Sequence, residues 1–215
     1  MTRTARVPAV IEEALWAAAR ARLPASVLSG ATLTAAVIER SRRYTTERDD
    51  LRGPTRGHAA AADLAARALF FTVADAGKLP LVLDELTAAR APAGFLTGER
   101  LAVLDVGAGC GAMTLGLLVH LAARGWGGEL TLTLVDHDSD ALAIGAAAIA
   151  QVAAALGVRC AISARDVDVT GGLPRGPFDL IVAGTIVNEL AAGTALVTAM
   201  MAALAPRGVA IVIEP

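Results

Sequence analysis

Residues 103–112, VLDVGAGCGA, form a hydrophobic run that ends in a series of small residues, and these residue types suit a nucleotide-like ligand. Because they lack side chains, Gly107 and Gly109 allow the backbone to approach a ligand closely. A helix that begins near Ala112 would point its unpaired N–H groups at the same ligand. The alternative is an ordinary tight turn between a strand and a helix, since a glycine pattern alone is a weak signal.

Two classes of nucleotide cofactor fit these glycines. Gly107, Gly109 and Ala112 satisfy the G-x-G-x-x-A variant of the dinucleotide fingerprint, with Asp136 at a suitable distance downstream. Asp105 distinguishes the two classes, because a carboxylate at the mouth of the loop would repel a pyrophosphate. The same charge suits a ligand that carries an ammonium and a sulfonium group. We therefore expect S-adenosyl-L-methionine (SAM) as the cofactor.

Carboxylates also end the next two hydrophobic runs. Asp136 ends residues 130–136, LTLTLVD, where its oxygens can accept hydrogen bonds from ribose hydroxyls. Asp166 ends residues 160–166 and is expected to accept from the adenine amino group, although Asp168 competes for that role and either can be a loop cap. The full set of expected cofactor-binding residues is Asp105, Gly107, Ala108, Gly109, Gly111, Asp136, His137, Asp166 and Val167.

Polar residues after the fourth hydrophobic run are the candidates for chemistry. Methyl transfer is an in-line displacement at a sulfonium, so the protein mainly aligns the nucleophile and, where needed, removes a proton. Thr185, Asn188 and Glu189 lie where substrates approach such folds, and the catalytic candidates are Asn188 and Glu189, with Glu189 as a base. A polar cluster that caps the start of a helix is an equally good interpretation.

These residues must be positioned by a sheet with helices around it. The first part of the chain has helical periodicity, clearest in residues 58–77, where Gly77 and Pro80 are expected to end the helix. The second part contains short apolar runs separated by Ala-rich segments of helical length, at 101–106, 130–136, 160–166, 178–184 and 208–214. Such long connections force parallel pairing with right-handed crossovers. We expect an α/β fold, with a helical N-terminal region at 1–95 and a Rossmann-like, doubly wound parallel sheet at 96–215.

The two parts of the chain differ in charge. Residues 1–67 hold 11 arginines against seven acidic residues, whereas residues 68–215 hold eight basic against 14 acidic residues. A basic arm can neutralise nucleic-acid phosphates and release their counterions. A solvated helical surface is the alternative interpretation of the same pattern.

Composition limits the class of protein. Although 55% of the residues are hydrophobic, Arg, Asp or Glu interrupts the Ala-rich stretches, so no membrane span is expected. Glu12 and Glu13 interrupt the only apolar stretch near the N-terminus, which speaks against a signal peptide and for a cytoplasmic location. Cys110 and Cys160 have no metal-ligand spacing around them, so we expect reduced thiols and no metal site.

Three segments resemble class I SAM-dependent methyltransferases, and the resemblance covers about residues 100–215. They are VLDVGAGCG at 103–111, LVDHD at 134–138 and FDLIVAG at 178–184. In that family a helix and an antiparallel hairpin usually follow the fifth strand, and no such hairpin is expected within these 215 residues.

More narrowly, the chain is similar to the methyltransferase-like family associated with the bacterial and mitochondrial small ribosomal subunit. The segments that carry this resemblance are RSRRYT at 40–45, HAAAADLAARALF at 58–70, VNEL at 187–190 and VIEP at 212–215. Members typically carry metal-binding cysteines after the final strand, and this sequence ends before such a region. The resemblance implies a SAM-dependent enzyme that acts on, or binds, ribosomal RNA or the small ribosomal subunit through its basic N-terminal region. The alternatives are a non-catalytic assembly factor and a small-molecule methyltransferase whose helical segment covers the pocket.

Overall fold

The computed structural model describes residues 8–46, 57–88, 96, 98–190 and 193–214. Its centre is a five-stranded parallel sheet in the order β3-β2-β1-β4-β5. The strands are β1 (Arg100–Val106), β2 (Glu129–Asp136), β3 (Arg159–Asp166), β4 (Phe178–Gly184) and β5 (Leu204–Ile213). The parallel sheet and the five predicted strands are thereby confirmed. The strand order reverses between β1 and β4, and ligands of open α/β sheets bind beside such a point, outside the carboxyl ends of the strands.

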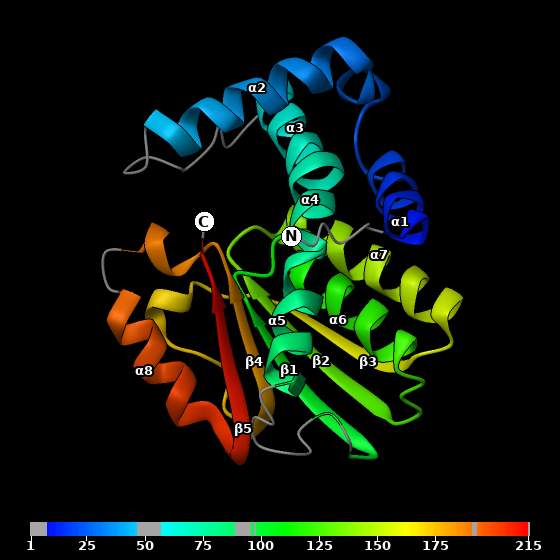
Figure 1. The fold of residues 1–215 in the computed structure, drawn as a ribbon. Helices are drawn as coiled ribbons and strands as arrows, with labels where there is room; N and C mark the ends of the chain where they lie inside the picture. Colours follow the sequence, from blue (N-terminus) through cyan, green and yellow to red (C-terminus); the bar gives the residue numbers. More distant parts are fainter. Residues whose placement is uncertain (1–7, 47–56, 89–95, 97, 191–192, 215) are drawn as a thin grey trace.

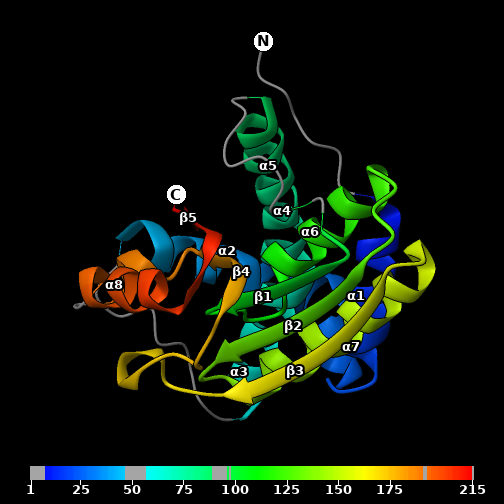
Figure 2. The ribbon, with the colours of Figure 1, turned by 90° about the horizontal axis from the view of Figure 1, so that it is seen from below.

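Helices cover both faces of this sheet (Figure 1). The connections between strands contain α6 (Ala112–Ala123), α7 (Ser139–Leu156) and α8 (Gly193–Ala203), with short helical turns η4 (Val169–Gly171) and η5 (Val187–Glu189). Viewed from below, α8 lies on one side of the sheet, and α1, α6 and α7 lie on the other (Figure 2). The fold is therefore doubly wound, as predicted.

Within the described residues, seven helical segments precede the sheet. They are α1 (Ala9–Arg20), η1 (Ala25–Leu28), α2 (Gly30–Thr46), α3 (Gly57–Ala66), the π-helical η3 (Arg67–Phe71), α4 (Thr72–Ala76) and α5 (Lys78–Ala88). The predicted helical N-terminal region is confirmed, and α2 and α3 lie beyond the edge of the sheet at which the strands end (Figure 1). One detail of the prediction is wrong. Gly77 ends α4, but Pro80 lies in the first turn of α5, where a proline needs no N–H partner.

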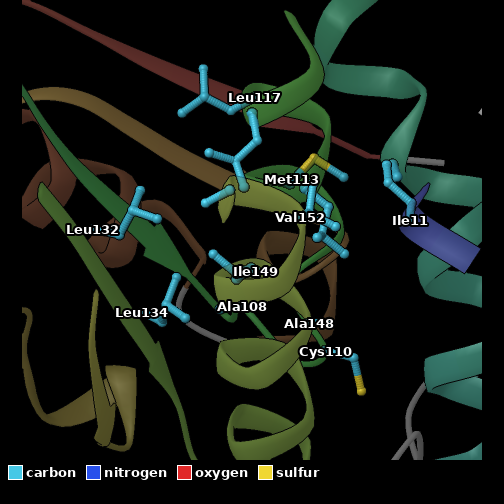
Figure 3. Packing of buried hydrophobic residues seen from close by; sticks show 14 of the residues in the cluster. Ile11, Ala108, Cys110, Met113, Leu117, Leu132, Leu134, Ala148, Ile149 and Val152 are labelled. Atoms are coloured by element: carbon cyan, nitrogen blue, oxygen red, sulfur yellow. The ribbon is translucent and has the colours of Figure 1, made fainter. Parts of the chain in front are cut away.

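The N-terminal helices share a hydrophobic core with the sheet. One buried cluster joins Ile11 of α1 with Leu132 and Leu134 of β2, Met113 and Leu117 of α6, and Ile149 and Val152 of α7 (Figure 3). The backbone of α4 also lies close against α6, because a Cβ atom on Gly116 would be 2.2 Å from the carbonyl oxygen of Ala76. The helices before the sheet are therefore packed against the elements that carry the glycine loop.

Helix α7 is the one helix in the described part of the chain that is long and apolar enough to cross a membrane. Its buried side chains, such as Ile144, Ile149 and Val152, pack in the core, and α1 lies against it. A position between the sheet and α1 accounts for its apolar sequence.

Candidate functional site

The loop between β1 and α6 has a backbone that favours glycine. Gly107, Gly109 and Gly111 have φ values of 67°, 50° and 88°, all in the left-handed region that other residues rarely adopt. Helix α6 begins at Ala112 directly after the third glycine, as predicted. Its first N–H groups therefore face the carboxyl edge of the sheet at the point where the strand order reverses.

The three glycines differ in what surrounds them. A Cβ atom on Gly107 would be 2.3 Å from Cδ1 of Ile186, and one on Gly111 would be 2.8 Å from Cδ1 of Ile149. A Cβ atom on Gly109 would meet only a carboxylate oxygen of Asp136, at 4.0 Å. The prediction assigned close approach of a ligand to both Gly107 and Gly109, but on its Cβ side Gly107 is covered by protein. Gly109 is the glycine next to open space.

Asp136 lies at the end of β2 and is tied to this loop. Its Oδ2 accepts a hydrogen bond of 2.8 Å from the backbone N–H of Gly109, and its Oδ1 accepts one of 2.9 Å from the N–H of Asp138. Asp136 is 8% exposed. The ring of His137 is exposed, with Nδ1 3.3 Å from Oδ1 of Asp136, so His137 is a neighbour of the carboxylate. Asp136 thus holds the glycine loop and keeps lone pairs that can accept further hydrogen bonds, while its role toward a ribose stays a prediction.

The side chain of Asp105 does not lie at the mouth of the loop, where the sequence analysis placed it. Its side chain is buried, and its Oδ2 accepts bonds from the hydroxyl of Thr114 at 2.7 Å and from the Thr114 N–H at 3.3 Å. Burial raises the pKa of Asp105 to about 7, and the two bonds from Thr114 only partly oppose this rise. The carboxyl group therefore titrates near neutral pH. Through its two bonds to Thr114 it also holds the first turn of α6.

The structure gives Asp166 and Asp168 different roles. Asp168 caps η4, because its Oδ1 accepts hydrogen bonds from the N–H of Thr170 at 2.9 Å and from the Thr170 hydroxyl at 2.7 Å. Asp166 lies beside Asp136 in the register of β3 and β2, and its side chain is exposed. The backbone N–H of Val167 donates to the carbonyl of Asp136 at 2.9 Å. Asp166 therefore remains the better candidate to contact an adenine.

The segment after β4 lies on the other side of the glycine loop. Thr185 has a φ of 60°, which is unusual for a β-branched residue and costs about 1–3 kcal/mol. The side chain of Ile186 packs on Gly107. Asn188 is exposed, and the side chain of Glu189 lies outside the described structure. The catalytic roles of Asn188 and Glu189 stay predictions.

Glu214 is a site residue that the sequence analysis missed. Its Oε1 accepts a hydrogen bond of 2.8 Å from the N–H of Val187, while its Oε2 is buried without a hydrogen-bond partner among the described residues. The N–H of Thr185 also donates to the carbonyl of Ile213 at 2.8 Å. The end of β5 therefore holds the segment after β4. The terminal VIEP segment entered the sequence analysis only as part of a resemblance, and nothing in these four residues indicated that Glu214 contacts Val187.

A contact from the N-terminal helices completes the surroundings of the loop. Arg67 of η3 forms an ion pair with Asp138, two residues after Asp136. Cys110 of the glycine loop is buried, which raises the pKa of its thiol to about 12, and its electrostatic neighbours include Arg67. Cys110 is therefore a protonated packing residue.

Two hollows in the described chain lie at the opposite edge of the sheet. One is lined by residues 173–177, Ala199 and residues 202–204, and the other by residues 98–100, 125–129 and Arg159. Neither touches the glycine loop. The candidate site is thus defined by its loop, its carboxylates and the start of α6.

Sheet order, crossovers and site position together define a Rossmann-like, doubly wound α/β fold. No protein-family model matches the chain, and no curated protein matches it. Among solved structures it is similar to a SAM-dependent methyltransferase from Aquifex aeolicus, with a TM-score of 0.44 and 18% identity over 65% of this chain and 65% of the other.

Two further solved structures contain S-adenosyl-L-homocysteine (SAH). The plantazolicin methyltransferase has a TM-score of 0.45 and 12% identity, over 84% of this chain and 59% of its own. Coclaurine N-methyltransferase, bound to N-methylheliamine and SAH, has a TM-score of 0.44 and 14% identity, over 95% of this chain and 58% of its own. The chain spans between 58% and 65% of the length of these three structures. At such identities the likeness does not extend to activity or substrate.

Proposed function

We propose that this protein is a SAM-dependent methyltransferase. The observation that carries the proposal is the bond between Gly109 and Asp136, because it places a carboxylate at the end of β2 beside an open glycine loop and the start of α6. A carboxylate in this position can accept hydrogen bonds from both hydroxyls of a ribose. When bound, SAM supplies an electrophilic methyl group on its sulfonium.

Charge favours SAM over a dinucleotide at this edge. Asp136, Asp138 and Asp166 lie at or just after the ends of β2 and β3, and Arg67 is already paired with Asp138. Acidic side chains repel a pyrophosphate and attract a cationic ligand. Asp105 adds to this charge when it is ionised, above a pH of about 7.

The acceptor would approach over the carboxyl end of β4. This chain's own residues there are Thr185, Asn188 and Glu214, of which Glu214 presents a buried oxygen with no described partner. Their task in an in-line transfer is to orient the nucleophile and, where it carries a proton, to accept a hydrogen bond from it.

For the acceptor, RNA of the small ribosomal subunit is the first candidate. The support is the resemblance of residues 40–45, 58–70, 187–190 and 212–215, which the fold distributes among α2, α3 with η3, η5 and the end of β5. Three of these segments contribute residues to contacts around the candidate site: Arg67 pairs with Asp138, and Glu214 accepts a hydrogen bond from Val187. A binding factor without catalysis would use the same surface.

A small-molecule acceptor is the second candidate, and the arginines of the N-terminal helices favour it. Arg40 pairs with Asp63, and both Arg42 and Arg43 pair with Glu39. Side chains engaged within the protein contribute less to phosphate binding than free ones. In addition, α2 and α3 lie beyond the carboxyl edge of the sheet, the edge from which a small acceptor would approach (Figure 1).

Calorimetric titration with SAM and with NAD tests the cofactor. We expect SAM to bind and NAD not to bind, and Asp136→Ala to weaken SAM binding at least about 100-fold, as expected for two lost hydrogen bonds to a carboxylate. Asp140→Ala is the matched control, because Asp140 is an exposed carboxylate in the first turn of α7. Tighter binding of NAD than of SAM would refute the proposal.

Transfer of a labelled methyl group then separates the acceptors. Incorporation into small-subunit RNA, with binding that weakens steeply as salt rises, would support the first candidate. Salt-dependent RNA binding without incorporation would identify a binding factor. SAM turnover with small nucleophiles alone would support the second candidate.

A further inference from the structure

A line of alternating charges connects α2 to the turn after β2. Nη1 of Arg40 lies 3.4 Å from Oδ1 of Asp63, and Nε of Arg67 lies 3.3 Å from Oδ2 of the same carboxylate. Arg67 then pairs through Nη2 with Oδ2 of Asp138. The four side chains are between 8% and 25% exposed, so water screens their interactions less than those of surface pairs.

Asp138 is the end of this line that meets the candidate cofactor site. Its Oδ1 caps α7 by accepting from the N–H groups of Asp140 and Ala141, at 3.1 and 3.0 Å. Its own N–H donates to Oδ1 of Asp136. Burial opposes ionisation of Asp138, but Arg67 and the N–H groups of α7 outweigh it and hold its pKa below the ordinary value. The ionised carboxylate therefore fixes the turn that contains Asp136.

A π-helical turn brings the N-terminal helices to the loop at a second point. In η3 the N–H of Thr72 donates to the carbonyl of Arg67, five residues earlier. Residues five apart lie on one side of such a turn, and π turns often occur at functional sites. Accordingly, Arg67 reaches Asp138, while Thr72, on the same side of the turn, lies close to Cys110 in the glycine loop.

We propose that Arg67 is a positioning residue of the cofactor site, which holds the turn from Asp136 to Asp138 and couples SAM binding to docking of the N-terminal helices. This inference rests on the proposed SAM-dependent function. Coupling of this kind is reciprocal: the docked helices strengthen cofactor binding, and bound cofactor stabilises the docked helices.

Two single substitutions and their combination test the role of the ion pair by calorimetry with SAM and with SAH. Arg67→Gln removes the cation, and Asp138→Asn removes the negative charge while keeping a residue that caps helices well. We expect each to weaken binding of both ligands about tenfold, and the double variant to lose little more, because the two residues act as one unit. Arg67→Lys, which keeps the charge, should recover part of the loss.

Arg124→Gln is the matched control. Arg124 pairs with Asp84 at 3.0 Å and joins the end of α6 to α5, away from the glycine loop. The same change of charge there should leave the affinity for SAM unchanged. Thermal unfolding of every variant identifies those that are folded at the titration temperature. If Arg67→Gln is unfolded there, Asp138→Asn provides the test.

Hydrogen exchange provides the readout that a purely structural ion pair would not change. SAM should slow exchange of amides in residues 57–76 of the unmodified protein, and should slow it much less in Arg67→Gln. Unchanged SAM affinity in folded Arg67→Gln and Asp138→Asn would overturn the inference, as would tighter binding, which would identify the ion pair as an inhibitory latch. Failure of the unmodified protein to bind SAM would instead refute the proposed function.

Discussion

The backbone N–H of Gly109 donates a 2.8 Å hydrogen bond to Oδ2 of Asp136, so the loop after β1 is joined to the end of the neighbouring strand. The two residues are 27 positions apart in the chain. Parallel pairing of Val106 with Val135 brings them together, because the two strands end at the same level. The residue assigned to ribose binding therefore also shapes the loop that borders the ligand.

Gly107 and Ile186 should behave as a packed pair. Gly107→Ala is expected to lower the free energy of unfolding by about 2–4 kcal/mol, because its Cβ would meet Ile186 and its backbone is left-handed. Combined with Ile186→Ala, the loss should be smaller than the sum of the two single losses. Gly109→Ala should lose only about 1–2 kcal/mol from backbone strain. Urea unfolding gives the free energy of unfolding of all four variants. Strictly additive losses for Gly107→Ala and Ile186→Ala would contradict the contact between these two residues.

Asp105 should make stability depend on pH. Its pKa is raised to about 7 in the folded protein, whereas an unfolded Asp ionises near pH 4. Between these values the folded state keeps a proton that the unfolded state has lost, so stability falls as pH rises from about 4 to 7. Asp105→Asn should flatten this profile and raise the free energy of unfolding at pH 8 by at most about 4 kcal/mol.

Urea unfolding at four pH values between 4 and 8 checks the role of Asp105. Asn can still accept a hydrogen bond from the Thr114 hydroxyl, so the variant tests the charge more than the contact. The control is Asp140→Asn, because Asp140 is exposed. Asp179 would not serve as a control, because its Oδ2 accepts a hydrogen bond from the backbone N–H of Ala102 in β1. A pH profile of Asp105→Asn parallel to that of the unmodified protein would show that another group causes the dependence.

Glu214 should control the segment after β4. Glu214→Ala removes the acceptor for the Val187 N–H, so exchange of that amide should become about tenfold faster, as expected for loss of a hydrogen bond to a charged group. Glu214→Gln keeps an acceptor oxygen and should change exchange much less. Hydrogen exchange followed by NMR resolves this single amide. Equal exchange in the two variants would mean that the bond does not hold the segment.

Arg40 and Arg42 are neighbours on α2 with different surroundings. Arg40 is buried and pairs with Asp63, which keeps Arg67 as a second partner, so Arg40→Gln should lower the free energy of unfolding by about 2 kcal/mol, as expected for loss of an interaction with a charged group. Arg42 pairs with Glu39 at the surface, so Arg42→Gln should change stability by less than about 1 kcal/mol. Thermal and urea unfolding measure the stability of Arg40→Gln and of Arg42→Gln. A similar loss in both would show that the line of charges adds little to the fold.

The sequence by itself determined the five strands, their parallel pairing, the start of α6 and the place of the glycine loop. Each depends on local information, because the apolar runs, the Ala-rich connections and the glycines are contiguous in the chain. The position of Asp136 at the end of β2 was predicted for the same reason, because it is the last residue of an apolar run. The side chain of Asp105 was placed wrongly, because its neighbours in sequence did not reveal burial against Thr114.

Only the tertiary structure decided which residues surround that loop. Ile186 covers Gly107 from 79 positions away, Glu214 holds Val187 across 27, and Arg67 reaches Asp138 across 71. None of these partners follows from periodicity, because each depends on how the crossovers and the N-terminal helices pack. The π turn at residues 67–71 has no local signature either, and it directs Arg67 to the site. Local patterns therefore specify the frame of this protein, while long-range packing selects the side chains that complete its candidate site.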